Sequence, residues 1–289
     1  MKTAVWLLKL TIPVSFAVFM LEYFGILNEI AILTEPFFHL LGLTGKASIV
    51  LITSYFVNIY SVIAVMATLD INLREGLILA NMCLIAHSMI VETGILKKTG
   101  SSAFRMVLLR FGAGFAMAWL LNLVLPPFEG KIHVQAGIAE PGFWNNFFHW
   151  TKAMAITSLK IVILVNLLLI LQKILSETGI LKWFEKPFYP IMQGMGLPVK
   201  TSFLWIVANT IGLSYGGAIM ISQSLEGILT QREADLLNHH IAISHSQLED
   251  TLLFAAIGLS VPWLMIPRFI LAIAVVWLRR LELATKRLQ

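Results

Sequence analysis

Residues 87–93 read HSMIVET, and residues 245–251, which lie 158 positions further on, read HSQLEDT. The same shift places Arg110-Phe111 on Arg268-Phe269 and Trp119 on Trp277. Upstream, a shift of 154 places residues 42–48 (GLTGKAS) on residues 196–202 (GLPVKTS). Polar residues that recur in the same order inside apolar runs predict that the chain consists of two homologous halves, residues 1–125 and 153–289.

The composition excludes a water-soluble globular protein. Of the 289 residues, 58% are hydrophobic and 13% are charged, whereas a soluble domain has about 25% charged residues. Apolar runs of about 20 residues, the length of a membrane-spanning helix, follow one another along most of the chain. The net charge of +5 comes from basic residues that lie mostly at the ends of these runs. They set membrane orientation, and we expect no nucleic-acid partner.

The expected fold is an all-α polytopic membrane protein with two inverted-topology repeats, each of three transmembrane helices plus a re-entrant or broken helical hairpin. The expected spans are residues 4–27, 47–69, 106–125, 153–171, 201–224 and about 260–278. The expected hairpins are residues 76–91 and 235–251, of which the second is too polar to face lipid. Residues 126–152 are expected to form an extracytoplasmic interfacial loop because of their aromatic side chains, Trp144, Phe147, Phe148 and Trp150.

The distribution of basic residues favours hairpins that do not cross the membrane. With that topology and a cytoplasmic N-terminus, 12 of the 16 basic residues outside the spans are cytoplasmic, against 9 if the hairpins cross. The positive-inside rule prefers the first arrangement, with both termini in the cytoplasm and the protein in the inner membrane of a bacterial-type cell. Halves in opposite orientations are typical of secondary transporters.

The two motifs supply imidazole, hydroxyl and carboxylate groups within apolar surroundings. Such intramembrane groups mark pathways for ions or solutes, and a helix break inside each motif would bring them to one central site. The candidate binding and coupling residues are His87, Ser88, Glu92, Thr93, His245, Ser246, Gln247, Asp250, Thr251, Arg110, Arg268, Asn58 and Asn209. Imidazole and carboxylate suit a divalent metal, so the metal candidates are His87, Glu92, His245 and Asp250.

A structural interpretation of the charged residues stays open. Glu92 and Arg110 are 18 positions apart, and so are Asp250 and Arg268. Each carboxylate can therefore neutralise its own arginine as a tie between helices. Small residues around Asn58 and Asn209 likewise serve helix packing more often than they line a substrate path.

On the duplicated His-Ser-x-x-x-Glu/Asp-Thr segments and the Gly-Leu-x-x-Lys-x-Ser loops, the chain resembles the Gate, or nucleoside-recognition, membrane domain superfamily. That domain is duplicated in ferrous-iron transporters of the FeoB type and occurs in spore-maturation membrane proteins. The resemblance implies a transport fold with two gates. This sequence has no GTP-binding domain, so no nucleotide switch is expected.

We therefore expect a transporter that moves a small polar solute or ion by alternating access and that is not an enzyme. The first cargo expected is a divalent metal such as ferrous iron. If Arg110 and Arg268 lie close to the site, they cancel its negative charge and favour a nucleoside or an organic anion. A second alternative is a non-transporting membrane scaffold or complex subunit. The expected partners are the lipid bilayer and the cargo, with a homodimer or a second membrane subunit as further options, and no cofactor is expected apart from a metal or coupling ion carried as cargo.

Overall fold

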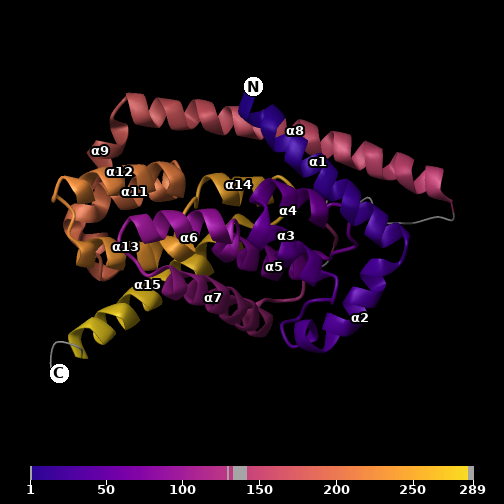
Figure 1. Ribbon diagram of the computed structural model, residues 1–289, viewed down its shortest axis with the longest axis horizontal. Helices are drawn as coiled ribbons and strands as arrows, with labels where there is room; N and C mark the ends of the chain where they lie inside the picture. The colour runs from indigo at the N-terminus through magenta and orange to yellow at the C-terminus, as the bar shows by residue number, and fades with distance from the viewer. Residues whose placement is uncertain (1, 129, 133–141, 286–289) are drawn as a thin grey trace. The chain divides into compact units, whose positions relative to one another are not determined.

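The computed structural model describes residues 2–128, 130–132 and 142–285, and these residues form helices joined by short connections (Figure 1). Within them, three uninterrupted helices are long and apolar enough to cross a bilayer, α7 (Ala103–Val124), α8 (Phe143–Glu177) and α15 (Val261–Thr285). The expected all-α polytopic membrane fold is confirmed. The remaining helices are α1 (Lys2–Tyr23), α2 (Ile26–His39), α3 (Ala47–Phe56), α4 (Ile59–Met66), α5 (Leu73–Ala86), α6 (Met89–Lys98), α9 (Ile180–Glu185), α10 (Tyr189–Gly194), the 3-10 turn η1 (Val199–Thr201), α11 (Ser202–Thr210), α12 (Leu213–Leu225), α13 (Gln231–Ser244) and α14 (Glu249–Ala255).

The chain divides into two compact units. Unit 1 contains Met1–Ser88, Gly114–Leu168 and Leu252–Leu264. Unit 2 contains Met89–Ala113, Leu169–Thr251 and Met265–Gln289. Each unit therefore includes residues from both halves of the sequence: residues 89–113, with α6, belong to unit 2, and residues 153–168 and 252–264 belong to unit 1.

In unit 1 the expected span 47–69 is not continuous. It is broken into α3 and α4 at Asn58, whose side-chain oxygen accepts a hydrogen bond from the Ser61 amide at 2.9 Å and caps α4. At 1.5 Å per residue these helices are about 15 and 12 Å long, too short to cross a hydrocarbon core of about 30 Å.

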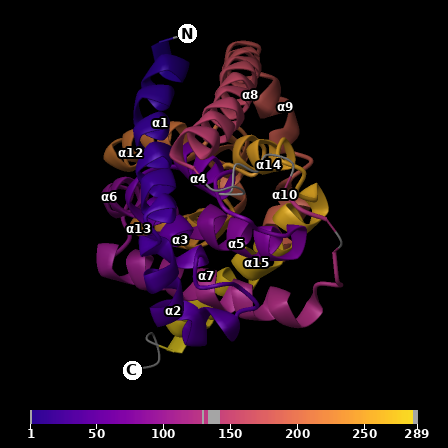
Figure 2. The same ribbon diagram turned by 90° about the vertical axis from the view of Figure 1, so that its right-hand side faces the viewer.

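The two ends of the α3–α4 segment lie at the same place in unit 1. The Thr44 amide, just before α3, donates to Glu75 Oε1 at 2.8 Å, and Asn72 caps the first turn of α5. The chain therefore enters and returns, and α3–α4 is a re-entrant hairpin that packs against α5, as Figures 1 and 2 show. This corrects the expectation that residues 47–69 cross the membrane.

Unit 2 repeats this arrangement in the expected span 201–224. Gly212 separates α11 from α12 with φ of 116°, a backbone conformation that side-chain-bearing residues rarely adopt. Lys200, at the start of the segment, pairs with Glu233 in the first turn of α13 at 2.6 Å and donates to the carbonyl of Ile228 at 3.0 Å. Both ends meet again, so α11–α12 is also a re-entrant hairpin.

The expected hairpin 76–91 is part of a longer broken segment, residues 73–98. Helices α5 and α6 meet at an angle of 41° and pass the length and hydropathy requirements of a span together. With 14 and 10 residues they are about 21 and 15 Å long, so neither helix alone crosses a hydrocarbon core of about 30 Å. The counterpart 235–251 is likewise broken, between α13 and α14.

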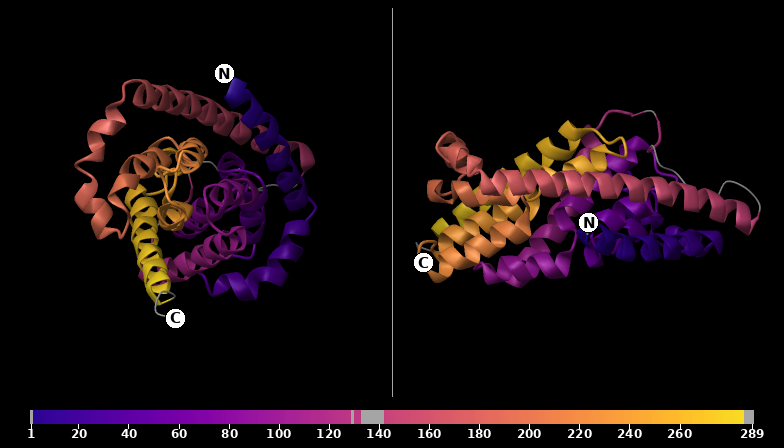
Figure 3. Two further views of the ribbon diagram at one scale, coloured as in Figure 1. Left: turned by 60° about the vertical axis from the view of Figure 1, so that its left-hand side comes forward. Right: turned by 90° about the horizontal axis from the view of Figure 1, so that it is seen from above.

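The first expected span, 4–27, ends early. Helix α1 stops at Tyr23, and α2 leaves it at 87° after Gly25, which has φ of 74° (Figure 3, left). A right-angle turn of this kind directs α2 away from the axis of α1, so the two helices do not form one straight span.

The aromatic segment before the fourth expected span is helical. Helix α8 begins at Phe143, and its Trp150 stacks on Phe19 of α1 with ring centroids 5.6 Å apart while its indole N–H donates to Ser15 Oγ at 3.2 Å. Trp150 is buried in unit 1, so this residue packs α8 against α1 instead of forming an interfacial loop. Residues 129 and 133–141 of the expected loop 126–152 lie outside the described residues.

Candidate functional site at the helix breaks

In unit 1 the helix breaks at His87 and Ser88, between α5 and α6. The Ser88 amide donates to the carbonyl of Ser54 at 2.8 Å, and its hydroxyl donates to the carbonyl of Val57 at 3.1 Å. Both acceptors lie where α3 ends, and carbonyls at a helix C-terminus lack an intrahelical donor. The break between α5 and α6 therefore supplies hydrogen-bond donors to the carbonyl groups at the tip of the re-entrant hairpin.

In unit 2 the same device is built at residues 245–248, between α13 and α14. The Ser246 amide donates to the carbonyl of Ala208 at 3.0 Å, and the Leu248 amide donates to the carbonyl of Asn209 at 3.2 Å. Both carbonyls belong to the last turn of α11. The unwound segment thus crosses the end of α11 and is held there through its backbone.

Both breaks depend on a serine in the left-handed region. Among the described residues other than glycine, only Ser88 and Ser246 have positive φ, 46° and 51°. Such conformations cost about 1–3 kcal/mol each and persist only where surrounding contacts impose them. The two serines are 158 positions apart, the spacing of the sequence motifs.

Unit 2 contains a buried charged cluster beside its break. Arg110 of α7 forms an ion pair with Glu92 of α6, and His245 Nε2 lies 3.2 Å from the same carboxylate. The other ring nitrogen of His245, Nδ1, lies 2.8 Å from the carbonyl of Ile241 and must carry hydrogen, because a carbonyl only accepts. The Glu92 carboxylate therefore lies between the Arg110 guanidinium and the His245 ring. The expected tie between Glu92 and Arg110 is present.

Arg268 of α15 is fully buried and holds the end of α13. Its Nη2 donates to the carbonyl of His245 at 2.8 Å, and its Nε donates to the carbonyl of Ile243 at 3.2 Å. It also lies within electrostatic range of Asp250, Glu92 and Arg110. Two buried arginines thus face two buried carboxylates, and with a neutral His245 the cluster carries no net charge.

The remaining candidates divide between packing and binding positions. Asn58 in unit 1 caps a helix. In unit 2, the hydroxyls of Thr93 and Thr251 are buried, and the described residues provide no hydrogen-bond partner for them. His87 belongs to unit 1, where its Nδ1 lies 3.1 Å from the carbonyl of Cys83. The metal-ligand set expected from the sequence stays a prediction: His87, Glu92, His245 and Asp250.

A cavity of about 440 Å³ opens beside the break in unit 2. Its lining includes three aromatic side chains, Phe188, Trp205 and Phe269, and two amides, Asn209 and Gln247. Asn209 Nδ2 donates to the carbonyl of Trp205 at 2.9 Å, whereas Asn209 Oδ1 and both amide atoms of Gln247 have no partner among the described residues. Buried amide atoms without partners cost about 1–3 kcal/mol each, and these atoms mark the wall of the cavity as a candidate binding position.

The aromatic lining was not anticipated from the sequence. Trp205 precedes Asn209 by four residues, which places both on one face of α11, and Phe269 follows the predicted Arg268. The Trp205 indole donates to His240 Nδ1 at 3.1 Å, so His240 is buried beside this wall. The four-residue spacing of Trp205 and Asn209 was the feature of the sequence that could have revealed this wall.

Comparisons with known proteins identify the family of this chain. The family model described as Gate, nucleoside recognition, matches residues 4–103. A membrane protein of Bacillus subtilis (strain 168), described as uncharacterized membrane protein YvoD, is 30% identical over 266 residues, which cover 89% of this chain and 84% of that protein. No solved structure gives a significant match.

Proposed function

This chain belongs to the Gate, or nucleoside-recognition, family of membrane proteins, and from that premise we propose that it transports a small solute of the nucleoside class. The observation that carries the proposal is the cavity at the break of α13–α14. Its volume of about 440 Å³ lies in the usual range for small-molecule sites. A planar base offers a face to Trp205 and Phe269, and its polar edge offers both donors and acceptors.

The amides of Asn209 and Gln247 suit such a polar edge. Asn209 Oδ1 and Gln247 Oε1 accept hydrogen bonds, and Gln247 Nε2 donates them. A ligand edge that places donors and an acceptor side by side pairs all three unpartnered groups. An aliphatic solute of the same volume would leave them buried and unpaired.

The charge balance argues against a divalent metal as cargo. Arg110 is already paired with Glu92, and Arg268 lies within electrostatic range of both Glu92 and Asp250. A divalent cation entering unit 2 would face two arginines as well as two carboxylates, so the local attraction for it is small. This balance favours the alternative of a nucleoside or organic anion, and the uncharged lining of the cavity favours the nucleoside.

The helix breaks supply a mechanism for movement. The tips are held by two hydrogen bonds each, Ser88 to Ser54 and Val57 in unit 1, and Ser246 and Leu248 to the end of α11 in unit 2. Exchange of these few bonds lets a tip shift while the helices on either side keep their backbone hydrogen bonds. Alternating access through such shifts requires no covalent chemistry, and we propose none.

We also propose an inner-membrane location with both termini cytoplasmic. Arg232 lines a cavity with Arg105 near the start of α7, whereas Arg74 donates to the carbonyl of Asn122 near its end at 2.7 Å. With re-entrant hairpins at residues 47–69 and 201–224, Arg232 is cytoplasmic and Arg74 is extracytoplasmic, the reverse of the expected topology. The split of 12 basic residues to 4 is unchanged, and the positive-inside rule again assigns the richer side to the cytoplasm.

Thermal unfolding of the purified protein in detergent tests the cargo class. We expect uridine or adenosine to raise the unfolding midpoint, and Gln247→Met, which keeps the volume and removes the amide, to abolish the increase. Gln193→Met on the exposed face of α10 is the matched control and should retain it. Flux of the same nucleosides into proteoliposomes should show the same dependence.

Other outcomes would replace the proposal. Stabilisation by Fe²⁺ or Mn²⁺ that is lost in the double variant His87→Ala, His245→Ala would assign a metal cargo. Stabilisation by carboxylic anions alone would assign an organic-anion transporter. Nucleoside binding without flux would point to a membrane scaffold or sensor.

A further inference from the structure

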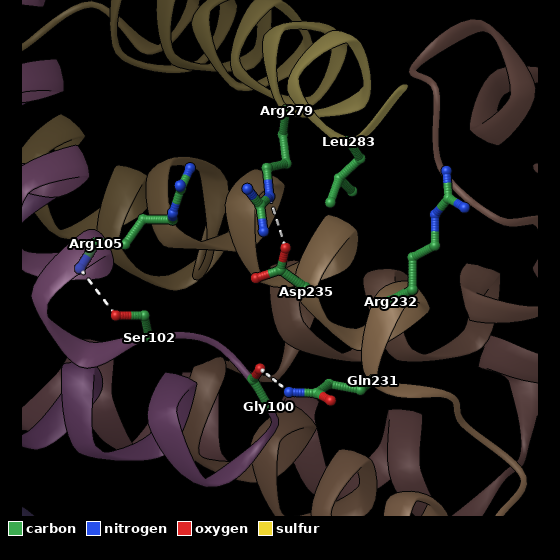
Figure 4. A pocket seen from close by; sticks show the side chains of 8 residues that line it. All are labelled: Gly100, Ser102, Arg105, Gln231, Arg232, Asp235, Arg279 and Leu283. Atoms are coloured by element: carbon green, nitrogen blue, oxygen red, sulfur yellow. Dashed lines mark hydrogen bonds and ion pairs between the residues drawn. The ribbon is translucent and has the colours of Figure 1, made fainter. Parts of the chain in front are cut away.

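A second polar site lies in unit 2, at the end where α7 begins and α15 ends. It is a cavity of about 490 Å³ whose lining includes Arg105, Arg232 and Arg279 (Figure 4). In that view Arg279 stands between the other two arginines, and its guanidinium points to Asp235. None of these residues belongs to the cargo site proposed above.

The charges of this cavity do not cancel. Arg105 donates two hydrogen bonds to Glu282, of 2.6 and 2.7 Å. Arg279 donates one hydrogen bond to Asp235 and one to Glu282, each of 2.7 Å. Ser101 occupies the other Asp235 oxygen at 2.7 Å. Arg232 is exposed, and within the described part of the chain it has neither a hydrogen bond nor an ion pair. Three arginines against two carboxylates leave one positive charge, which Arg232 carries.

An apolar cavity continues from the charged one. Its volume is about 630 Å³, and it shares Ser102, Arg105 and Arg279 with the first cavity. The remainder of its wall includes Phe104, Leu108 and Leu278, which are 74%, 55% and 64% exposed on the candidate spans α7 and α15. Apolar side chains exposed on a spanning helix face lipid, so this cavity is accessible from the bilayer.

One buried polar group completes the junction of the two cavities. His239 is 3% exposed and lines the apolar cavity. Its Nδ1 lies 2.7 Å from the carbonyl of Asp235 and therefore carries hydrogen. Its Nε2 has no partner among the described residues, so neutral His239 offers an acceptor to a hydroxyl group.

We propose that these joined cavities bind one anionic phospholipid. The phosphate lies among Arg232, Arg279 and Arg105, where the single excess positive charge matches a phosphodiester monoanion. An acyl chain follows Leu108 and Leu278 toward the bilayer, and a head-group or glycerol hydroxyl donates to His239. A zwitterionic lipid adds a cation beside three arginines and is therefore disfavoured.

Native mass spectrometry of the full chain in detergent tests this site with named probes. We expect one tightly retained phosphatidylglycerol, and an affinity at least about tenfold lower for phosphatidylcholine. Arg232→Gln should weaken phosphatidylglycerol binding about tenfold, the usual effect of losing one charge-assisted hydrogen bond. Because Arg232 is exposed and unpaired, this variant should unfold at the wild-type temperature.

Lys98→Gln is the matched control, since it removes an exposed positive charge from α6 in the same unit without touching either cavity. It should leave phosphatidylglycerol binding unchanged. An equal loss in both variants would show unspecific attraction to anionic lipid and overturn the proposal. Glycerol 3-phosphate or inorganic phosphate binding as tightly as the lipid would assign the charged cavity to a soluble anion and also overturn it.

Discussion

Arg110 is fully buried in unit 2, and its ion pair with Glu92 makes each residue dependent on the other. Removing one member of a buried pair leaves an uncompensated charge, which costs about 3–5 kcal/mol. We therefore expect Arg110→Met to lower the stability of the protein by about this amount in thermal or denaturant unfolding, even where lipid is present.

The companion variant separates this ion-pair effect from lost packing. Arg110→Met combined with Glu92→Leu removes both charges and should recover most of the stability, because no buried charge is left unpaired. Lys97→Met, at an exposed position of α6, should change stability by less than about 0.5 kcal/mol. A double variant as unstable as the single one would mean that Arg110 acts through packing alone.

Residue spacing predicted part of the candidate site. The 18-residue separation indicated the pair of Glu92 and Arg110, and the position of Gln247 in the repeated motif indicated a binding group. The spacing did not reveal that His245 of the second motif contacts Glu92 of the first, because that contact depends on α6 belonging to unit 2. Nor did it single out Trp205, since an isolated tryptophan in an apolar run is compatible with lipid contact or packing.

At the scale of elements, Gly212 decides where the second re-entrant hairpin turns. Its φ of 116° is unfavourable for any residue with a Cβ, although a Cβ there would meet Ser246 Oγ at an unstrained 3.5 Å. Gly212→Ala should therefore destabilise the protein through its backbone, by about 1–3 kcal/mol.

Gly94 provides the matched control for this substitution. It lies inside α6, and a Cβ at this position would have no other atom within 4 Å. Gly94→Ala should therefore raise stability by about 0.5–1 kcal/mol through helix propensity. Midpoints of thermal unfolding compare the two variants. A Gly212→Ala protein as stable as the wild type would show that the break does not need positive φ.

Apolar length predicted that residues 47–69 and 201–224 lie within the membrane, and it failed to predict that they turn back. A hydrophobic window reports the environment of a segment but not its direction. The direction is set by polar contacts between distant residues, Thr44 with Glu75 and Lys200 with Glu233, and these contacts leave no periodic signal. The same limitation applies to residues 76–91, because the window missed the first residues of α5.

For the whole molecule, the corrected hairpins change which loops share a side of the membrane. The positive-inside rule alone cannot decide between the two topologies, because Arg74 and Arg232 exchange places and the count stays 12 to 4. The contact network favours the topology with two re-entrant hairpins, since Arg232 and Arg105 line one cavity in unit 2. Charge patterning thus predicts cytoplasmic termini with either topology, whereas the identity of the hairpins required the fold.

Cysteine accessibility distinguishes the two topologies in intact cells. The chain has one cysteine, Cys83, which is buried, so Cys83→Ala gives a background without reactive thiols. On that background we expect Arg232→Cys and Lys98→Cys to be protected from a membrane-impermeant maleimide until the membrane is opened. Lys46→Cys and Lys131→Cys should react from outside. Labelling of position 232 from outside while position 98 stays protected would restore residues 201–224 as a crossing helix. It would place Lys200 and Glu233 on opposite sides of the membrane and so contradict the structure, in which they lie 2.6 Å apart.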